Sequence, residues 1–332
     1  LMFATLSIQG ITRLGKREKV EYWMQERNIS ILLLQETHVN LNVREQRKRY
    51  TWFFSGNVDK KDSNGKLTPN TEAGVAIVID NELLNYIWDI QPISDRIMTL
   101  TLGYSLPISF VNNYAPHANI HEEIKYEHYN QLQEEQLKLQ KKGPTYTAGD
   151  FNARLQKRQN ATEKCIGQHT FDRNHNTLAR QEENVVENRS LLITHCNQTD
   201  NVIIDTFFQK PNSKKVTHRH CETRHGPPWT RENGYEALDH ILTPNRWKNS
   251  VKDSETDTDF MDSDHYPLIA KIQIKLKAKP YTPKNSRQKY EQPTLLQIWQ
   301  YNEELFTKAQ SSNNPIWIDA LEIVNNKFPE KT

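Results

Sequence analysis

The sequence predicts a layered α/β domain with one chemical site at an edge of its sheets. Largely apolar runs such as residues 29–34 and 73–79 are typical of strands covered on both faces. Residues 16–28 and 121–142 repeat apolar side chains at helical spacing between such runs. Polar side chains suited to chemistry stand at or beside five strand ends, where ligands of layered α/β proteins converge.

Composition narrows the class of protein without naming a partner. The chain has 332 residues, a net charge of +2 and 36% hydrophobic residues, which fits one large domain or two ordinary ones. Affinity for a polyanion must therefore come from a local patch. The three cysteines are an odd number, which favours a reducing compartment over a disulfide framework. No apolar run reaches membrane-span length, so we expect a soluble intracellular protein without a membrane partner.

The first half of the chain is expected to be rich in strands. Residues 3–8 alternate well enough for a strand, and Val20, Trp23 and Met24 recur at helical spacing in the helix that follows. Further along we expect the following elements: strand 29–34, a basic helical segment around 44–49, aromatic strand 50–54, polar loop 57–71, and strands 73–79, 96–102 and 108–113.

The second half begins with a charged amphipathic helix at 121–142, which we expect in an outer layer with its apolar positions inward and its charges solvated. Those apolar positions are Ile124, Tyr129, Leu132 and Leu137. The remaining expected elements are strand 145–148, polar segment 154–189, helix 188–196, strand 202–207, basic loop 210–233, and strands 238–242 and 268–274. Beyond Lys275 a Pro/Lys-rich linker and helical pieces follow. We therefore expect one domain at 1–276 and a linker with a helical connector at 277–332.

The stretch from Thr145 to Ala153 is the most informative part of the chain. An apolar-leaning strand ends at Gly149, and Asp150 and Asn152 stand two residues apart, so extended chain would point both to one side. A carboxylate can polarise a water or help to hold a hard cation, and an amide can donate to an anionic oxygen. Both are needs of phosphoryl chemistry. The alternative is a turn, which Gly, Asp and Asn also favour.

Five segments together resemble a known family. They are Leu-Gln-Glu-Thr at 34–37, Asn-Tyr-Ala-Pro at 113–116, Ala-Gly-Asp-Phe-Asn-Ala at 148–153, Leu-Asp-His-Ile at 238–241 and Ser-Asp-His-Tyr-Pro at 263–267. In order and spacing they resemble the endonuclease/exonuclease/phosphatase superfamily, and within it the apurinic-like endonuclease of non-LTR (LINE-type) retrotransposons. The resemblance covers residues 2–276. It implies a two-sheet β-sandwich flanked by helices in four layers, a Mg²⁺-dependent site and phosphodiester cleavage.

The resemblance also implies catalytic roles for the residues at these positions. Asp150 would orient and deprotonate the attacking water, while Asn152 and Tyr114 would donate hydrogen bonds to phosphate oxygens. His265 would stabilise the negative charge that develops on the phosphate, and Asp239 would orient its imidazole. Considered alone, Tyr114 could instead be a core aromatic residue, and His265 could instead cap a helix or strand.

The implied metal site departs from the family pattern. Glu36 would be the carboxylate ligand of Mg²⁺, with Mn²⁺ as a substitute, and one direct ligand suffices because Mg²⁺ keeps its waters; a surface carboxylate is the alternative. Asp264 would assist through a metal-bound water. Ser7 stands where the first strand normally ends with an Asn near the metal, with Gln9 two residues on, and His117 stands where many relatives have Asn. Ser7 still donates a hydrogen bond but cannot span the same distance.

DNA is the substrate that the retrotransposon resemblance implies. Basic loops contain Arg154, Lys157 and Arg158 and then residues 214–231, and Trp229 is suited to stack or wedge at the cut site. A solvated loop is the alternative for each single Lys or Arg. The resemblance further implies a nick with a 3′-hydroxyl for target-primed reverse transcription, a covalently linked reverse transcriptase and a nuclear location.

Three other hypotheses stay open at this point. The superfamily includes enzymes that act on small phosphorylated substrates, so a phosphomonoesterase or phosphodiesterase of that kind is one. A catalytically impaired DNA-binding remnant, caused by the change at Ser7, is the second. The third is a structural zinc site, whose candidate ligands are His218, His220, Cys221 and His225 with Cys165, His169, His195 and Cys196.

Overall fold

The protein, described here from a computed structural model, is defined at residues 1–56, 73–173 and 183–274. The loop expected at 57–71 and the linker and connector expected at 277–332 lie outside these residues, as does part of the polar segment 154–189. None of the helices in the described ranges combines the length and the apolar character that a membrane crossing requires.

Two mixed sheets form the centre of the fold. The seven-stranded sheet has the order β14 (Val251–Thr256), β15 (Leu268–Ile272), β1 (Met2–Ser7), β2 (Ile31–Gln35), β5 (Val75–Asp80), β4 (Tyr50–Ser55) and β3 (Arg44–Gln46). The six-stranded sheet has the order β10 (Asn201–Ile203), β13 (Asp239–Pro244), β9 (Thr145–Asp150), β8 (Ile108–Tyr114), β7 (Ile97–Leu102) and β6 (Ile87–Pro92). In each sheet one central pair is parallel, β1 with β2 and β8 with β9.

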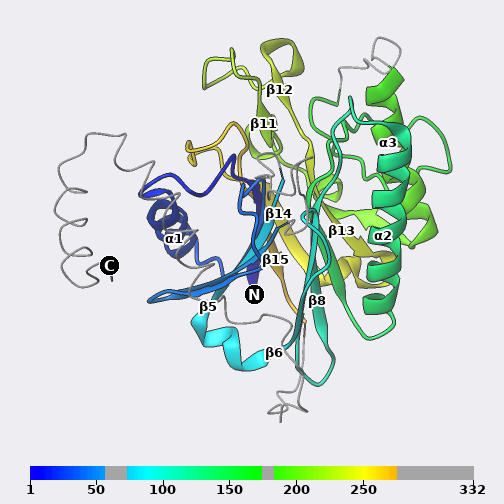
Figure 1. The fold of residues 1–332 in the computed structure, drawn as a ribbon. Coiled ribbons are helices and arrows are strands. Elements are labelled where there is room, and N and C mark those ends of the chain that lie inside the picture. Colours follow the sequence, from blue (N-terminus) through cyan, green and yellow to red (C-terminus); the bar gives the residue numbers. More distant parts are fainter. Residues whose placement is uncertain (57–72, 174–182, 275–332) are drawn as a thin grey trace, which may run out of the picture. The chain divides into compact units, whose positions relative to one another are not determined.

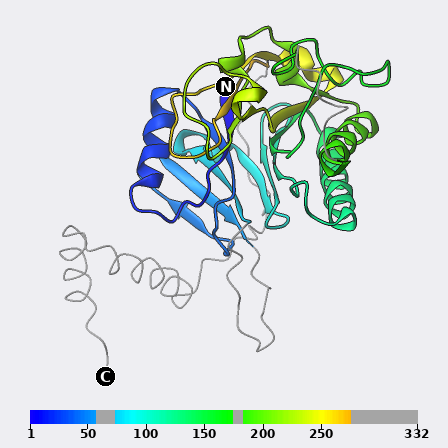
Figure 2. The same ribbon diagram turned by 90° about the horizontal axis from the view of Figure 1, so that it is seen from above.

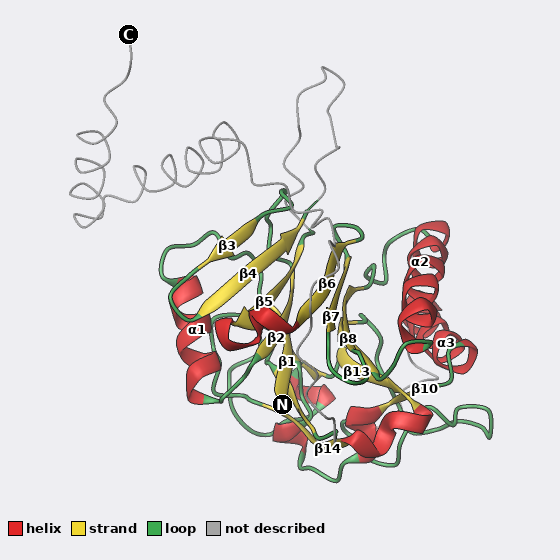
Figure 3. Cartoon of the chain, turned by 90° about the horizontal axis from the view of Figure 1, so that it is seen from below, coloured by secondary structure: helices red, strands yellow, loops and turns green. Residues whose placement is uncertain are grey.

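Helices cover the outer faces of both sheets. Helix α1 (Lys16–Glu26) lies against the seven-stranded sheet, and α2 (Glu122–Gln140) and α3 (Glu183–Gln198) lie against the six-stranded sheet (Figures 1 and 3). Short 3₁₀ helices connect the strands: η1 (Asn81–Tyr86), η3 (Ile204–Phe207), η4 (Asn212–Lys214), η5 (Arg231–Asn233) and η6 (Asn245–Ser250). The predicted two-sheet sandwich flanked by helices in four layers is confirmed.

The core between the sheets explains why the central strands are continuous apolar runs. Leu33 of β2 belongs to the cluster between the sheets together with Phe3, whose ring lies 5.2 Å from that of Phe110 in the opposite sheet. Neighbouring Leu32 is equally buried although it points the other way. Both faces of such a strand lose contact with water, so both kinds of position are apolar.

Helix α2 is rotated relative to the expected apolar face. Tyr129 and Leu132 are buried as predicted, but Ile124 is 51% exposed. Its neighbour Lys125 is buried instead, because its ammonium group donates to the carbonyl of Ala118 (2.8 Å) and pairs with Glu187 of α3. A buried cation with two partners thus replaces the expected apolar contact.

Several element predictions were wrong at the sheet edges. The basic segment at 44–49 is not helical and contains β3, an edge strand antiparallel to β4. Arg47, directly after this strand, forms ion pairs with three carboxylates beside that edge, those of Glu18, Glu21 and Glu45. The strand expected at 202–207 ends at Ile203 and continues as η3. Strands β6 and β14 and the small hairpin of β11 (His218–Arg219) and β12 (Tyr235–Glu236) were not predicted.

A buried amide joins the two sheets. Asn112 of β8 donates through Nδ2 to the carbonyl of Leu34 (2.9 Å) and to that of Ala76 (2.8 Å), both in the opposite sheet. Its Oδ1 accepts from Gln35 Nε2 at 2.6 Å. All of these groups are excluded from water, so each bond is costly to break. The contact fixes the position of one sheet against the other.

We expect Asn112→Leu to lower the free energy of unfolding by roughly 2–4 kcal/mol, because two carbonyls and the Gln35 amide would lose their buried partner. Urea denaturation measures this change. Asn130→Leu on the exposed face of α2 is the matched control, for which a change within about 0.5 kcal/mol is expected. Equal destabilisation by both variants would contradict a structural role for the bridge.

Candidate active site

The strand ends that carry the predicted residues lie together at one edge of the sandwich. Parallel pairing places Ser7 of β1 beside Gln35 of β2, with Glu36 next in the chain. In the other sheet, Asp150 of β9 lies between Tyr114 of β8 and Asp239 of β13. Loops of the second half of the chain lie over these ends when the molecule is viewed from above (Figure 2).

One hydrogen bond crosses between the sheets within the site. The phenol of Tyr114 donates to Glu36 Oε1 at 2.9 Å. Burial and the charge of Glu36 raise the pKa of Tyr114 well above its ordinary value, so the phenol remains a donor. The guanidinium of Arg96 lies 4.6 Å from the centre of the Tyr114 ring and adds a positive charge beside the two residues.

Asp150 is a buried carboxylate next to like charge. Its Oδ1 accepts the backbone N–H of Asn152 at 2.7 Å, and the Asn152 amide donates to the carbonyl of Ala115 at 3.0 Å. Burial and the neighbouring carboxylate of Asp239 raise the pKa of Asp150 to about 8. The raised pKa makes the ionised carboxylate a stronger base than an ordinary aspartate.

His265 forms a charged pair with Asp239. Its Nδ1 lies 2.8 Å from Asp239 Oδ2. Burial of the imidazole opposes its protonation, but the charge and hydrogen bond of Asp239 prevail and raise the pKa of His265 to about 10. Asp239 also lines a cavity of about 20 Å³ with Thr170 and Ser254, enough for one water molecule. The imidazole is therefore a cation, and its Nε2 lies outside the bond to Asp239.

The end of β1 holds the segment that carries Asp264 and His265. Gln9 Nε2 donates to Asp264 Oδ2 at 2.7 Å. The hydroxyl of Ser263 donates to the carbonyl of Ser7 at 2.7 Å and accepts the N–H of His265 at 3.1 Å. Asp264 and His265 thus take their position from the first strand, more than 250 residues earlier.

The backbone of the site is locally strained. Gln9, Glu36 and Asn152 adopt left-handed conformations with φ of 51°, 53° and 49°, as does His38 with 56°. Each such conformation costs a non-glycine residue on the order of 1–3 kcal/mol, and these conformations concentrate at functional sites. The sharp turns at Gln9, Glu36 and Asn152 occur within two residues of the ends of β1, β2 and β9.

The residues fit a hydrated divalent ion. Glu36 is half-buried and keeps one carboxylate oxygen outside the bond to Tyr114, and the buried hydroxyl of Ser7 has no hydrogen-bond partner among the described residues. The described ranges contain no group of three His, Cys, Asp or Glu side chains arranged to hold a metal. Mg²⁺ does not need one, because it binds through one or two carboxylates and retains its waters.

The zinc hypothesis is wrong for the described residues. Cys165 and Cys196 are buried in the cluster between the six-stranded sheet and its helices, while Cys221 is exposed on the hairpin side. His195 Nε2 lies 2.7 Å from the amide oxygen of Gln136, and His225 bonds to the hydroxyl of Tyr266. The candidate ligands therefore have separate structural roles.

The two predicted substrate contacts are both engaged within the protein. Arg154 Nε pairs with Glu236 Oε1 at 3.2 Å beside the site. The half-buried indole of Trp229 packs against Tyr235 at 4.8 Å and His225 at 5.4 Å between ring centres. This packing fixes the loop after β11, so the indole is a structural anchor and the structure does not support a free wedge.

Sequence reasoning missed three residues of the site. Gln9 appeared only as a departure from the family pattern, Arg96 only as the start of a strand, and His218 only among zinc candidates. The His218 ring lies 4.8 Å from that of His265. No spacing along the chain signals these contacts, because each joins segments distant in sequence.

Comparison with known proteins identifies the family and the fold. The profile described as "Endonuclease/Exonuclease/phosphatase family" matches residues 5–265. Craniofacial development protein 2 of Bos taurus is 26% identical over 218 residues, 64% of this chain, and the match spans about a third (33%) of that relative's length. The Xenopus laevis APE2 catalytic domain superposes with a TM-score of 0.61 at 16% identity, covering 85% of this chain and 95% of that one. A variant of the 3′ phosphatase NExo of Neisseria, bound to product DNA hairpin, superposes with a TM-score of 0.57 at 15% identity, covering 82% of this chain and 100% of that one.

We expect Asp239→Asn to lower the pKa of His265 from about 10, because burial then opposes the imidazolium without its partner carboxylate. Because the pKa of His265 is higher in the folded than in the unfolded protein, its protonation stabilises the fold fully below about pH 6.5. This stabilisation is lost as pH rises toward 10. Metal-free wild type should therefore lose more stability than Asp239→Asn between pH 8 and 10, a window above the pKa of Asp150. Thermal unfolding in EDTA measures this, with exposed Asp200→Asn as control. Parallel curves for wild type and Asp239→Asn would contradict the assigned pair.

Proposed function

The chain belongs to the endonuclease/exonuclease/phosphatase family, and on that premise we propose that it is a Mg²⁺-dependent DNA endonuclease. The observation that carries the proposal is the convergence of three separate chemical groups at one edge. These are the Glu36–Tyr114 pair, the buried carboxylate of Asp150 and the Asp239–His265 pair. Each supplies a different requirement of phosphodiester hydrolysis.

Asp150 acts as the base in the proposed reaction. It orients a water and accepts one of its protons while the water oxygen attacks phosphorus. The bond between phosphorus and the 3′ oxygen breaks and the leaving oxygen takes a proton from solvent water. The products are a 3′-hydroxyl and a 5′-phosphate. Burial and the charge of Asp239 raise the pKa of Asp150, so its ionised carboxylate is a stronger proton acceptor than an ordinary aspartate.

The other residues stabilise the charge that develops on the phosphate. His265 donates from its imidazolium and Asn152 from its amide. Tyr114 has one hydroxyl hydrogen, so it exchanges its bond to Glu36 for one to a phosphate oxygen when the substrate binds. Glu36 would hold the divalent ion, with Ser7 beside it, and Asp264 would orient a water of that ion. When bound, Mg²⁺ or Mn²⁺ neutralises part of the charge on the attacked phosphate.

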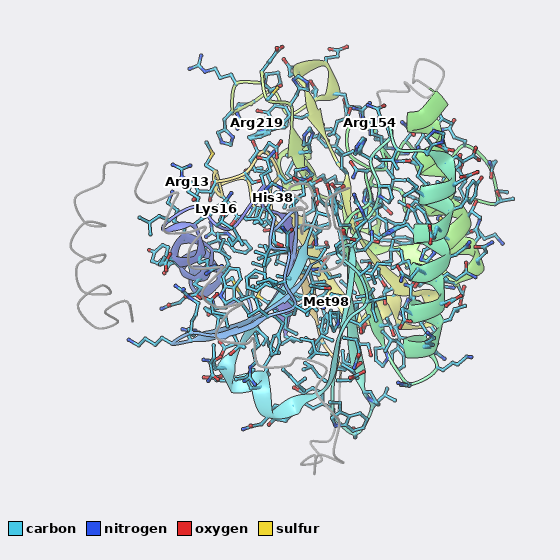
Figure 4. All side chains as sticks on the ribbon, in the orientation of Figure 1. Arg13, Lys16, His38, Met98, Arg154 and Arg219 are labelled. Atoms are coloured by element: carbon cyan, nitrogen blue, oxygen red, sulfur yellow. The ribbon has the colours of Figure 1, made fainter. Side chains whose placement is uncertain are left out.

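Positive charge around the site supports DNA as the substrate. Arg154 and Arg219 lie in the upper part of the molecule and Arg13 lies to the left near α1, with Met98 in the centre below (Figure 4). Arg154 is paired with Glu236, so its charge is partly balanced. Arg96 adds a cation directly beside Tyr114. The similar structures include a phosphatase bound to a DNA product, which favours DNA over small phosphorylated substrates. Phosphate contacts of this kind position a duplex without reading its sequence.

We extend the proposal to target-primed reverse transcription on the strength of the retrotransposon-type motifs. The nick would supply the 3′-hydroxyl primer, a covalently linked reverse transcriptase would extend it, and the reaction would take place in the nucleus. This extension depends on the motif resemblance at 148–153 and 263–267.

We expect the protein to relax supercoiled plasmid with Mg²⁺ and to leave it intact with EDTA. Asp150→Asn and His265→Ala should lower the nicking rate by about 10²–10⁴-fold, the usual contribution of a positioned acid or base. Asp200→Asn, an exposed carboxylate on a distant turn, should nick at the wild-type rate. Extension of the nick by a DNA polymerase without phosphatase treatment reports the 3′-hydroxyl.

Three outcomes would redirect the assignment. Nicking by Asp150→Asn at the wild-type rate would rule out the assigned base. Phosphate release from inositol phosphates with intact plasmid would indicate a small phosphorylated substrate. Salt-dependent DNA binding without nicking under any divalent ion would indicate an impaired DNA-binding remnant.

A further inference from the structure

His218 lies in a strand that is fixed on both sides. On one side β11 pairs with β12, which places His218 opposite Glu236. On the other side it pairs with the segment that carries the Asp264–His265 dipeptide, where His218 bridges His265. The N–H of Arg219 donates to the carbonyl of Asp264 at 2.9 Å. The hairpin and the site segment therefore form one continuous hydrogen-bonded unit.

The side chain of His218 packs against the catalytic imidazole. The two ring centres are 4.8 Å apart and the rings are inclined by 60°. His218 Nε2 is 3.9 Å from Asp264 Oδ2, beyond hydrogen-bonding distance. The His218 side chain is only 21% exposed. Its contact with His265 is thus one of packing, in the tilted geometry that aromatic rings favour.

The two rings differ in charge. Asp239 keeps His265 protonated. Burial and the positive charge of His265 lower the pKa of His218 to about 3, so its ring is neutral. A neutral aromatic ring beside a cation is attractive, whereas a second cation would repel. The contact therefore favours a protonated His265 ring beside a neutral His218 ring.

The bond to Asp239 does not by itself fix the direction of the His265 ring. It anchors Nδ1, but rotation about the Cβ–Cγ bond of histidine is soft, so the ring can still tilt about that anchor. Tilting would move Nε2, the nitrogen that donates to the phosphate in the proposed reaction. Packing against the face of the ring restricts this tilt, and the His218 ring packs there.

We propose that His218 is a positioning residue that holds the His265 imidazolium in its reactive direction, so that the β11–β12 hairpin controls the geometry of the site. The catalytic part of this inference rests on the proposed endonuclease function. The structural part does not, because it concerns the order of the Asp239–His265 pair without metal or DNA.

Three substitutions separate packing from hydrogen bonding. His218→Ala removes this packing, His218→Phe restores a ring of similar width, and His218→Gln restores polarity without a ring. His220→Ala, two residues along and exposed, is the matched control. The first readout is the downfield NMR signal of the His265 Nδ1 proton in metal-free, DNA-free protein. The second is kcat and KM for plasmid nicking with Mg²⁺.

We expect His218→Ala to broaden or lose the Nδ1 proton signal and to lower kcat about ten- to a hundredfold with KM unchanged, as small misplacements of catalytic groups do. His218→Phe should restore both readouts, and His218→Gln should restore neither. A wild-type signal and kcat in His218→Ala would overturn the inference, and so would rescue by Gln but not by Phe. If wild type itself does not nick, the proposed function fails while the NMR comparison still decides the positioning role.

Discussion

The contact on which the site depends is the buried amide bridge between the two sheets. Asn112 reaches the carbonyls of Leu34 and Ala76, and the side chain of Gln35 reaches Asn112. Glu36 follows Gln35 directly, and Tyr114 follows Asn112 by two residues. The bridge therefore sets the distance across which Tyr114 donates to Glu36. A relative shift of the sheets would separate the carboxylate side of the site from the phosphate-stabilising side.

The register of the strands also determines which charged groups lie side by side in the site. Antiparallel pairing of β9 with β13 places Asp150 opposite Asp239 in a buried setting, and like charges there resist double ionisation. The imidazolium of His265 relieves this repulsion by bonding to Asp239, while burial and the neighbouring charge raise the pKa of Asp150. One register thus produces both a base and a cation. The departures at Ser7 and Gln9 leave this arrangement intact, since Gln9 contacts Asp264 and Ser7 contacts Ser263 through its carbonyl.

The central strands of the sheets could be predicted from the sequence more reliably than the edge strands. Strands such as β2 and β5 are buried on both faces, so their apolar runs are unambiguous. Edge strands β3 and β14 keep polar residues on an open face and lack that pattern. The strand-end residues could be proposed because strand ends are visible along the chain. Contacts such as Gln9 with Asp264 or His218 with His265 depend on tertiary pairing, which no local spacing encodes.

The central claim is that Glu36 and His265, far apart in sequence, serve one metal-dependent site. Titration of ¹⁵N-histidine-labelled protein with Mn²⁺ tests it most directly, because the paramagnetic ion broadens only nearby ring signals. The account predicts that substoichiometric Mn²⁺ broadens His265 and His218 while His195 of α3 stays sharp, and that Glu36→Gln abolishes this selectivity. Initial broadening at His195, or unchanged broadening of His265 in Glu36→Gln, would contradict it.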